Sequence, residues 1–171
     1  MESSPVLTAP GSVAAAEAAV DDRAPEAIVV RFGGARYGIP MADVAEVIQV
    51  PRLTRVPGSP SWLTGVANWR GRVLAVVDLR PVVGNELAPL PSSARLVVMT
   101  SDVAEAGLLV EAVSGLLSPD RPAPEPVPAT VAPAVAELVT GVVDDGGPVS
   151  FLDVPAVLRL RSRLPSAHRT T

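Results

Sequence analysis

Short runs of β-branched and apolar residues, each ended by glycine, proline or another turn residue, constrain the fold of this chain most strongly. The runs include IVVRF, RVLAVVDL, ARLVVMT and VSFLD. Runs of this length, separated by turn residues, are typical of β-strands, and we count roughly eight to ten of them at the spacing found in β-barrels. Helix is predicted only in short pieces. The sequence therefore indicates an all-β fold.

Several elements can be predicted from turn residues and periodicity. Residues 28–32 and 36–39 are predicted strands joined by a Gly-Gly turn, because glycine adopts the positive φ angles of tight turns. Residues 144–147, DDGG, predict the last hairpin turn. In residues 41–48 apolar side chains recur at helical spacing, which predicts one or two turns of amphipathic helix. Residues 73–77 are apolar at every position, which predicts a strand buried on both faces.

Proline-rich segments separate these elements. Residues 50–63 contain three prolines and predict a connector, because proline cannot lie within a central strand. Six of the fifteen residues from 119 to 133 are proline, which predicts an extended surface loop. Residues 154–164 predict a closing helix with arginines on its solvent face.

Composition divides the chain into a central domain and two tails. Residues 1–27 are acidic and rich in Ala, Ser and Pro, so we predict a disordered tail. Residues 161–171 form an Arg-rich tail. Each half of the remaining domain, residues 28–160, contains a hairpin, a connector and an apolar strand. Two small barrels, at about 28–85 and about 93–157, are therefore favoured over one sandwich, although the sequence leaves both open.

Missing residue types exclude several functions. There are no cysteines and all 14 basic residues are arginine, so disulfides, thiolate metal sites and lysine chemistry are excluded. The single histidine, His168, lies in the C-terminal tail, where it cannot serve a catalytic triad. No apolar run is long enough to span a bilayer, and no secretory signal is recognisable. We therefore expect a cytoplasmic protein without membrane insertion.

Charge and acidic pairs offer little further chemistry. The net charge is −4, and the one basic cluster is the C-terminal tail, which has no aromatic residues, so nucleic-acid binding is not expected. Asp144 and Asp145 would suit a carboxylate-based hydrolase or a hard metal, but their sequence context favours a polar turn. Asp43 and Glu46 are interpreted as a solvated face. A carboxylate-based enzyme or small-ligand sensor on a β-barrel is the remote alternative.

The segment GVANWRGRVLAVVDLR, residues 65–80, concentrates unusual residues before a strand. In one interpretation Gly65 and Gly71 are turn residues and Trp69 is a core aromatic. In the other, Arg70 is presented to a protein partner, because Arg and Trp are enriched at binding hot spots. Physical reasoning on the sequence alone leaves the two interpretations equal.

Residues from about 28 to 160 resemble the CheW-like domain, the coupling module of bacterial chemosensory systems. Three blocks carry the resemblance in order: FGGARYGIPMADVAEVI, RVPGSPSWLTGVANWRGRVLAVVDLR, and GLLVEAVSGLL followed by LVTGVV and VSFLDVPAVL. The second block is similar to the family signature Gly-Val-x-Asn-Leu-Arg-Gly followed by a strand that ends in Val-Asp-Leu-Arg.

The resemblance implies two small five-stranded SH3-like β-barrels that share a core, with short helices including a C-terminal one. It implies no catalytic activity, no cofactor and no metal. The implied function is an adaptor that couples chemoreceptors, the methyl-accepting chemotaxis proteins, to the histidine kinase CheA, and that is recruited to the inner face of the membrane through receptor arrays. The implied partners are the receptor signalling tip, the CheA regulatory domain and other CheW-like proteins. By family motif, the receptor-binding residues are Val44, Glu46, Gly65, Arg70, Leu96 and Leu116, and kinase-binding residues are not identified.

Three positions depart from the family pattern. Trp69 replaces the usual Leu, Ala75 replaces a usual Pro, and Glu111 replaces a usual Asp. A bulkier Trp69 must be accommodated by its neighbours or point outward, which would reshape the surface around Arg70. The alternative function is therefore that of a divergent CheW-like paralogue, which binds only one partner and regulates a specialised chemosensory pathway.

Overall fold

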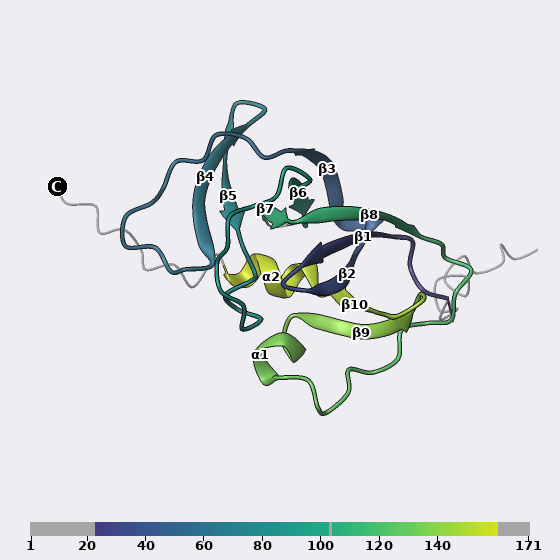
Figure 1. Cartoon of the computed structure of the whole chain (residues 1–171). Coiled ribbons are helices and arrows are strands. Elements are labelled where there is room, and N and C mark those ends of the chain that lie inside the picture. The colour runs from purple at the N-terminus through teal and green to yellow at the C-terminus, as the bar shows by residue number, and fades with distance from the viewer. Residues whose placement is uncertain (1–22, 103, 161–171) are drawn as a thin grey trace, which may run out of the picture.

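Two five-stranded sheets make up the protein in a computed structural model that describes residues 23–102 and 104–160 (Figure 1). The first sheet has the strand order β8-β1-β2-β10-β9, and the second has the order β3-β6-β7-β5-β4. Neighbouring strands are antiparallel except at β2–β10 and β5–β7, which are parallel. The predicted all-β fold with two five-stranded units is confirmed.

The elements have the following bounds. The strands of the first sheet are β1 (Ala27–Phe32), β2 (Ala35–Pro40), β8 (Ala112–Leu117), β9 (Val139–Asp144) and β10 (Pro148–Leu152). Those of the second sheet are β3 (Val44–Gln49), β4 (Leu63–Trp69), β5 (Arg72–Val77), β6 (Arg95–Thr100) and β7 (Glu105–Val110). The helical pieces are the 3-10 turn η2 (Met41–Asp43) and the α-helices α1 (Pro133–Ala136) and α2 (Val154–Leu160).

The sheets do not follow the contiguous halves expected from the sequence. The first sheet combines residues 27–40 with residues 112–152, and the second sheet lies between them in sequence, at residues 44–110. The division into barrels at about 28–85 and about 93–157 is therefore wrong. Its physical cause is that the β1–β2 hairpin completes its hydrogen bonding with the distant strands β8 and β10, and such non-local pairing leaves no signal in local composition.

Order begins earlier than predicted. Ala24 and Ala27 are buried in a cluster of the first sheet, so the disordered tail expected over residues 1–27 is wrong for its last residues. The rest of that tail, at residues 1–22, and the Arg-rich tail at residues 161–171 lie outside the described residues.

Residues 41–48 form a 3-10 turn and strand β3, so the predicted amphipathic helix is wrong. Val44, Glu46 and Ile48 are partly buried and alternate with exposed residues, which is the period of a strand. The run satisfies helical spacing as well, and pairing with β6 along its length decides in favour of the strand.

Strand β5 is buried on both faces only at its C-terminal end. Val76 and Val77 are fully buried, whereas Val73 is 79% exposed. β5 pairs with β4 along its whole length but with β7 only at Val76 and Val77, so the tip of the β4–β5 hairpin extends beyond the sheet. The prediction of two buried faces is therefore wrong for Val73, and an exposed hairpin tip results.

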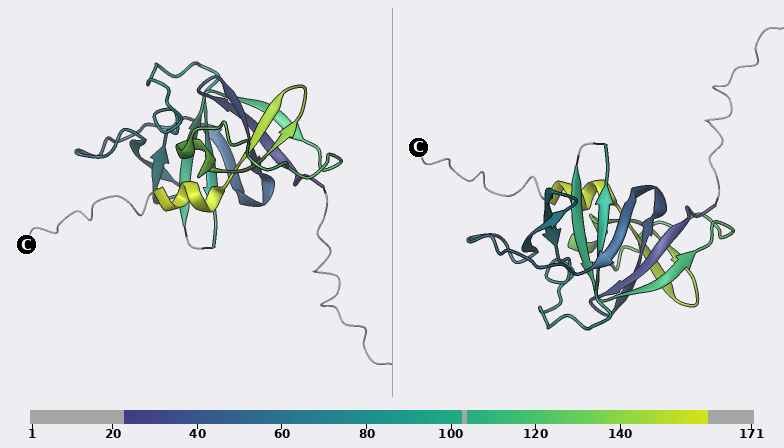
Figure 2. Two further views of the ribbon diagram at one scale, coloured as in Figure 1. Left: turned by 90° about the horizontal axis from the view of Figure 1, so that it is seen from below. Right: turned by 90° about the horizontal axis from the view of Figure 1, so that it is seen from above.

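The turns and loops largely agree with the sequence. Gly33 and Gly34 have positive φ in the first hairpin, and residues 144–147 turn between β9 and β10. Residues 50–62 form a connector that projects from the body of the molecule in both views of Figure 2. Residues 119–132 contain no named strand or helix.

One hydrophobic core joins the two sheets. Phe32 and Ile39 of the first sheet, Met99 and Leu108 of the second, and Val157 of α2 belong to a single buried cluster. α2 accordingly lies between the sheets in the centre of Figure 1. The shared core expected from the resemblance is confirmed.

Candidate functional site

The tip of the β4–β5 hairpin is a tight turn at Arg70 and Gly71. Both residues have positive φ, 50° and 75°, which is the pattern of a type I′ turn. Arg70 is the only non-glycine residue with positive φ in the described part of the chain, and this conformation costs an L-residue roughly 1 kcal/mol or more. The Gly71 N–H donates to Oδ1 of Asn68 at 3.0 Å, which stabilises the turn. The turn holds the Arg70 side chain 67% exposed.

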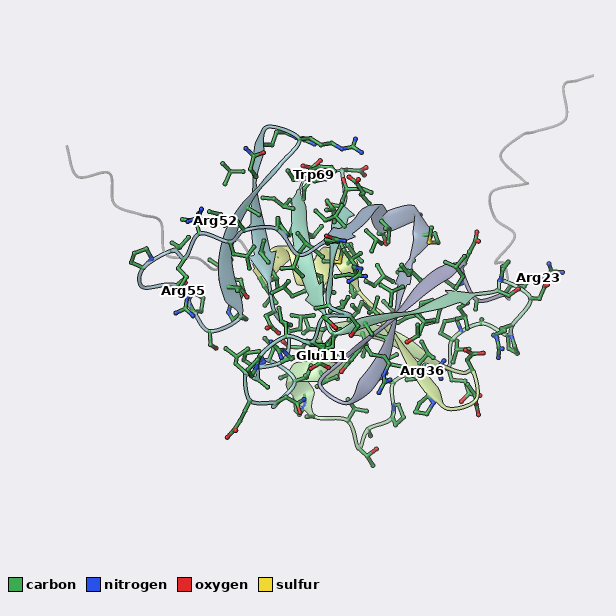
Figure 3. The ribbon with its side chains drawn as sticks, turned by 45° about the horizontal axis from the view of Figure 1, so that its top comes forward. Arg23, Arg36, Arg52, Arg55, Trp69 and Glu111 are labelled. Atoms are coloured by element: carbon green, nitrogen blue, oxygen red, sulfur yellow. The ribbon has the colours of Figure 1, made fainter. Side chains whose placement is uncertain are left out.

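Trp69 joins this hairpin to β3. Its side chain is buried, only 7% of the residue being exposed, in a cluster that includes Leu74 and Leu96. Its indole Nε1–H donates to Oε2 of Glu46 at 2.8 Å, and the same oxygen lies 3.1 Å from Nη2 of Arg70. The two interpretations of the segment are therefore complementary, because Trp69, labelled in Figure 3, is a core aromatic and the neighbouring Arg70 is exposed.

Two guanidinium groups lie over the Trp69 ring. The Arg70 and Arg72 guanidinium carbons are 5.1 Å and 5.2 Å from the ring centroid, within the range of cation–π attraction. Nη2 of Arg72 also lies 3.1 Å from Oε1 of Glu105 on β7. Each contact is worth about 1 kcal/mol or less at the surface, but together they fix the orientation of both arginines.

The other residues named by family motif occupy different environments. Gly65 is buried in β4, where an added Cβ would overlap the carbonyl oxygen of Thr54. Thr54 and Val66 exchange two backbone hydrogen bonds of 2.8 Å. Because Gly65 has no side chain, the connector can pack directly against β4 at this point. Val44 is partly buried at the start of β3. The structure thus gives Gly65 a packing role.

Leu96 and Leu116 differ sharply in exposure. Leu96 is fully buried, and its side chain fills the space that a Cβ of Gly107 would occupy. The expectation that Leu96 binds the receptor is therefore wrong, because its side chain points into the core of the second sheet and has no exposed surface. Leu116 is 65% exposed on β8, the edge strand of the first sheet. Among the motif residues, Glu46 and Arg70 are thus the two that a side-chain ion pair joins.

Sequence reasoning missed a buried ion pair that supports this region. Asp78 and Arg80 are 2% and 4% exposed, and Nη2 of Arg80 donates to Oδ2 of Asp78 at 2.7 Å. This hydrogen bond raises the pKa of Arg80, although burial acts in the opposite direction. Nη1 of Arg80 also donates to the carbonyl of Ala88 at 2.9 Å. The sequence did contain a signal for this pair. Asp-Leu-Arg directly follows an apolar run, and charges that lie within a core must be paired.

The acidic pairs have structural roles. Asp145 pairs with Arg36 at 2.9 Å and also with Arg121, while Oδ1 of Asp144 accepts the N–H of Gly147 at 3.0 Å, as a polar turn requires. Burial and the nearby Asp153 raise the pKa of the Asp43 carboxyl. The Glu46 carboxylate instead accepts the hydrogen bond from the Trp69 indole in the hairpin. Within residues 23–102 and 104–160, no group of three His, Cys, Asp or Glu residues is arranged to hold a metal ion.

An open cavity of about 590 Å³ lies beside the connector. It is lined by residues 55–61, by Leu87 and Leu90, and by the Asp78–Arg80 pair.

The helices of the described residues are all too short or too polar to cross a membrane.

The CheW-like domain family matches residues 26–162. This chain belongs to the CheW-like family. The crystal structure of the scaffolding protein CheW from Thermoanaerobacter tengcongensis is similar, with a TM-score of 0.68 and 25% identity over 77% of this chain and 85% of that one. Both share the two-part SH3-like fold.

Proteins similar to this chain in sequence carry several different names. FrzA of Myxococcus xanthus is 34% identical over 118 residues, which are 68% of this chain and 72% of FrzA. Chemotaxis protein CheW of Klebsiella aerogenes is 26% identical over 68% of this chain and 70% of its own length. PilI of Pseudomonas aeruginosa is 43% identical over 86 residues, which are 50% of this chain and 48% of PilI. The match to PilI therefore spans about half of each protein.

Proposed function

We propose that this protein is a non-enzymatic adaptor that couples chemoreceptors to the histidine kinase CheA, with the β4–β5 hairpin tip as its receptor contact. The observation that carries the proposal is Arg70, which is exposed in a strained turn and held against Glu46 of β3. Backbone strain and a fixed exposed arginine are features of binding surfaces. Membership in the CheW-like family supports the adaptor role.

The hairpin tip has the chemistry to bind a receptor helix. Arg70 offers a planar guanidinium to polar side chains of the partner, and Glu46 adds an opposite charge that fixes orientation. Val73, 79% exposed on the same hairpin, offers apolar surface. Val44 and Leu116 are further candidates, and because they lie on different sheets, one receptor helix that reaches both must cross from one sheet to the other. Bound in this way, the adaptor would be cytoplasmic and held at the inner face of the membrane by receptors.

Charge reversal at the tip tests the receptor contact. Arg70→Glu is expected to weaken binding of a purified receptor cytoplasmic fragment by at least roughly tenfold, because it places a second carboxylate beside Glu46 and removes the guanidinium. Arg55→Glu is the matched control, since Arg55 lies on the connector, apart from Trp69 in Figure 3 and outside the hairpin tip. Receptor binding by Arg70→Glu within twofold of the wild type, with unchanged melting temperature, would contradict the assignment.

A divergent paralogue is the second candidate function. The observation that favours it is Trp69 at the centre of the tip, where the family usually has Leu, together with the 43% identity to PilI. Binding the receptor fragment and the regulatory domain of CheA in separate titrations distinguishes the two. An adaptor binds both proteins, whereas a paralogue with one contact binds a single one of them.

A further inference from the structure

Trp69 is the buried residue of the hairpin tip, residues 68–72. Its backbone belongs to β4, and its ring packs in a cluster with Leu74 of β5, Leu96 of β6 and Leu109 of β7. Its indole N–H reaches β3 through Glu46. The Trp69 side chain therefore shares a core cluster with residues of β5, β6 and β7 and is hydrogen-bonded to β3.

Trp69 also determines the surroundings of Arg70 and Glu46. A single oxygen, Oε2 of Glu46, accepts from the indole at 2.8 Å and pairs with Arg70 at 3.1 Å, while the Arg70 guanidinium lies over the ring at 5.1 Å. The other carboxylate oxygen of Glu46 makes no hydrogen bond to the described residues. That oxygen and the outward face of Arg70 are free to meet a partner.

A leucine at position 69 would provide neither restraint. It has no N–H for Glu46 and no aromatic face for Arg70 or Arg72. An exposed ion pair on its own holds two long side chains weakly, because ordering them costs rotamer entropy. The Arg70–Glu46 pair has exposed side chains, 67% and 36%, so its order depends on the tryptophan.

We propose that Trp69 is a positioning residue, which holds Arg70 and Glu46 in the arrangement that the partner binds and so raises the affinity of this hairpin. The inference rests on the proposed function of the hairpin tip as a receptor contact. Trp69 itself is buried and acts through Arg70 and Glu46.

Indole resonances test the positioning in the isolated chain. The sequence has two tryptophans, so two indole N–H signals are expected in a ¹H–¹⁵N spectrum, and Trp69→Phe identifies one by its loss. Glu46→Ala is expected to shift the Trp69 signal and speed its hydrogen exchange, while the Trp62 signal stays in place. An unmoved Trp69 signal in Glu46→Ala would overturn the proposal.

A double-mutant cycle tests the effect on binding. Trp69→Phe keeps an aromatic side chain but removes the indole N–H, and we expect it to weaken binding of the receptor fragment roughly tenfold. In the Glu46→Ala/Arg70→Ala background the same change is expected to have less than about a twofold effect, because Trp69 acts through these two residues. A purely structural role would instead give equal losses of affinity in both backgrounds, and would overturn the proposal. If the wild-type chain does not bind the fragment, the proposed function fails, and the indole spectra still decide whether Trp69 positions Glu46.

Discussion

Removal of Arg80 is expected to destabilise the protein far more than removal of a partly exposed arginine. In Arg80→Ala the Asp78 carboxylate, 2% exposed, loses three side-chain hydrogen bonds of 2.7–3.1 Å and keeps only the backbone N–H of residue 80 at 3.0 Å. Breaking a buried ion pair by removing one partner costs about 3–5 kcal/mol, because it leaves an uncompensated charge. That is a large fraction of a typical folding stability of about 5–15 kcal/mol.

Urea unfolding and thermal melting, both followed by circular dichroism, measure this loss. In the thermal melt, the melting temperature should fall by roughly 6–20 °C, at about 2–4 °C per kcal/mol for a chain of this size. Arg36→Ala is the control, because the Arg36–Asp145 pair is 29% and 25% exposed in its side chains and should cost about 1 kcal/mol or less. The double variant Asp78→Leu/Arg80→Met should recover most of the loss, since no buried charge remains. A loss in Arg80→Ala no larger than that in Arg36→Ala would refute the reasoning.

Three further substitutions test local packing and charge. Gly65→Ala should lower the unfolding free energy by about 1–3 kcal/mol in urea titrations, because its Cβ would overlap the Thr54 carbonyl; an unchanged midpoint would contradict this. Asp43→Asn should raise stability at neutral pH by about 0.5 kcal/mol or less. Because the folded pKa of Asp43 lies above its ordinary value of 3.8, the benefit should disappear as the pH falls through that raised pKa, and a benefit that grows at low pH would contradict it. Asp153→Ala should cost about 1 kcal/mol in thermal melts, since Oδ1 of Asp153 accepts the Ala156 N–H at the start of α2; equal melting would exclude this cap.

Local signals predicted much of the fold, and non-local pairing accounts for the main errors. The turns at residues 33–34 and 144–147 were predictable because turn residues report backbone conformation directly. Residues 41–48 satisfy helical and strand periods together, and only pairing with β6 decides between them. The mixing of distant segments in one sheet was equally invisible, since composition does not reveal which strands pair.

Local signals in the sequence likewise predicted only part of the candidate site. Arg70 stood out because an arginine beside glycine in a turn has no packing role, and its exposure agrees with that interpretation. The direction of a side chain in a strand is harder to predict, so Leu96 was expected at the surface and lies in the core. The contact between Trp69 and Glu46 joins residues 23 positions apart, and no pattern in the sequence indicates it.

Reconstituted signalling tests the central claim most directly. Receptor-containing membranes and CheA are mixed with the wild-type chain, and kinase autophosphorylation is measured with and without the receptor. The adaptor account predicts that kinase activity rises only when receptor and this chain are both present, and that Arg70→Glu abolishes the rise while Arg55→Glu preserves it. Kinase activity that is independent of this chain, or a full rise with Arg70→Glu, would contradict the account.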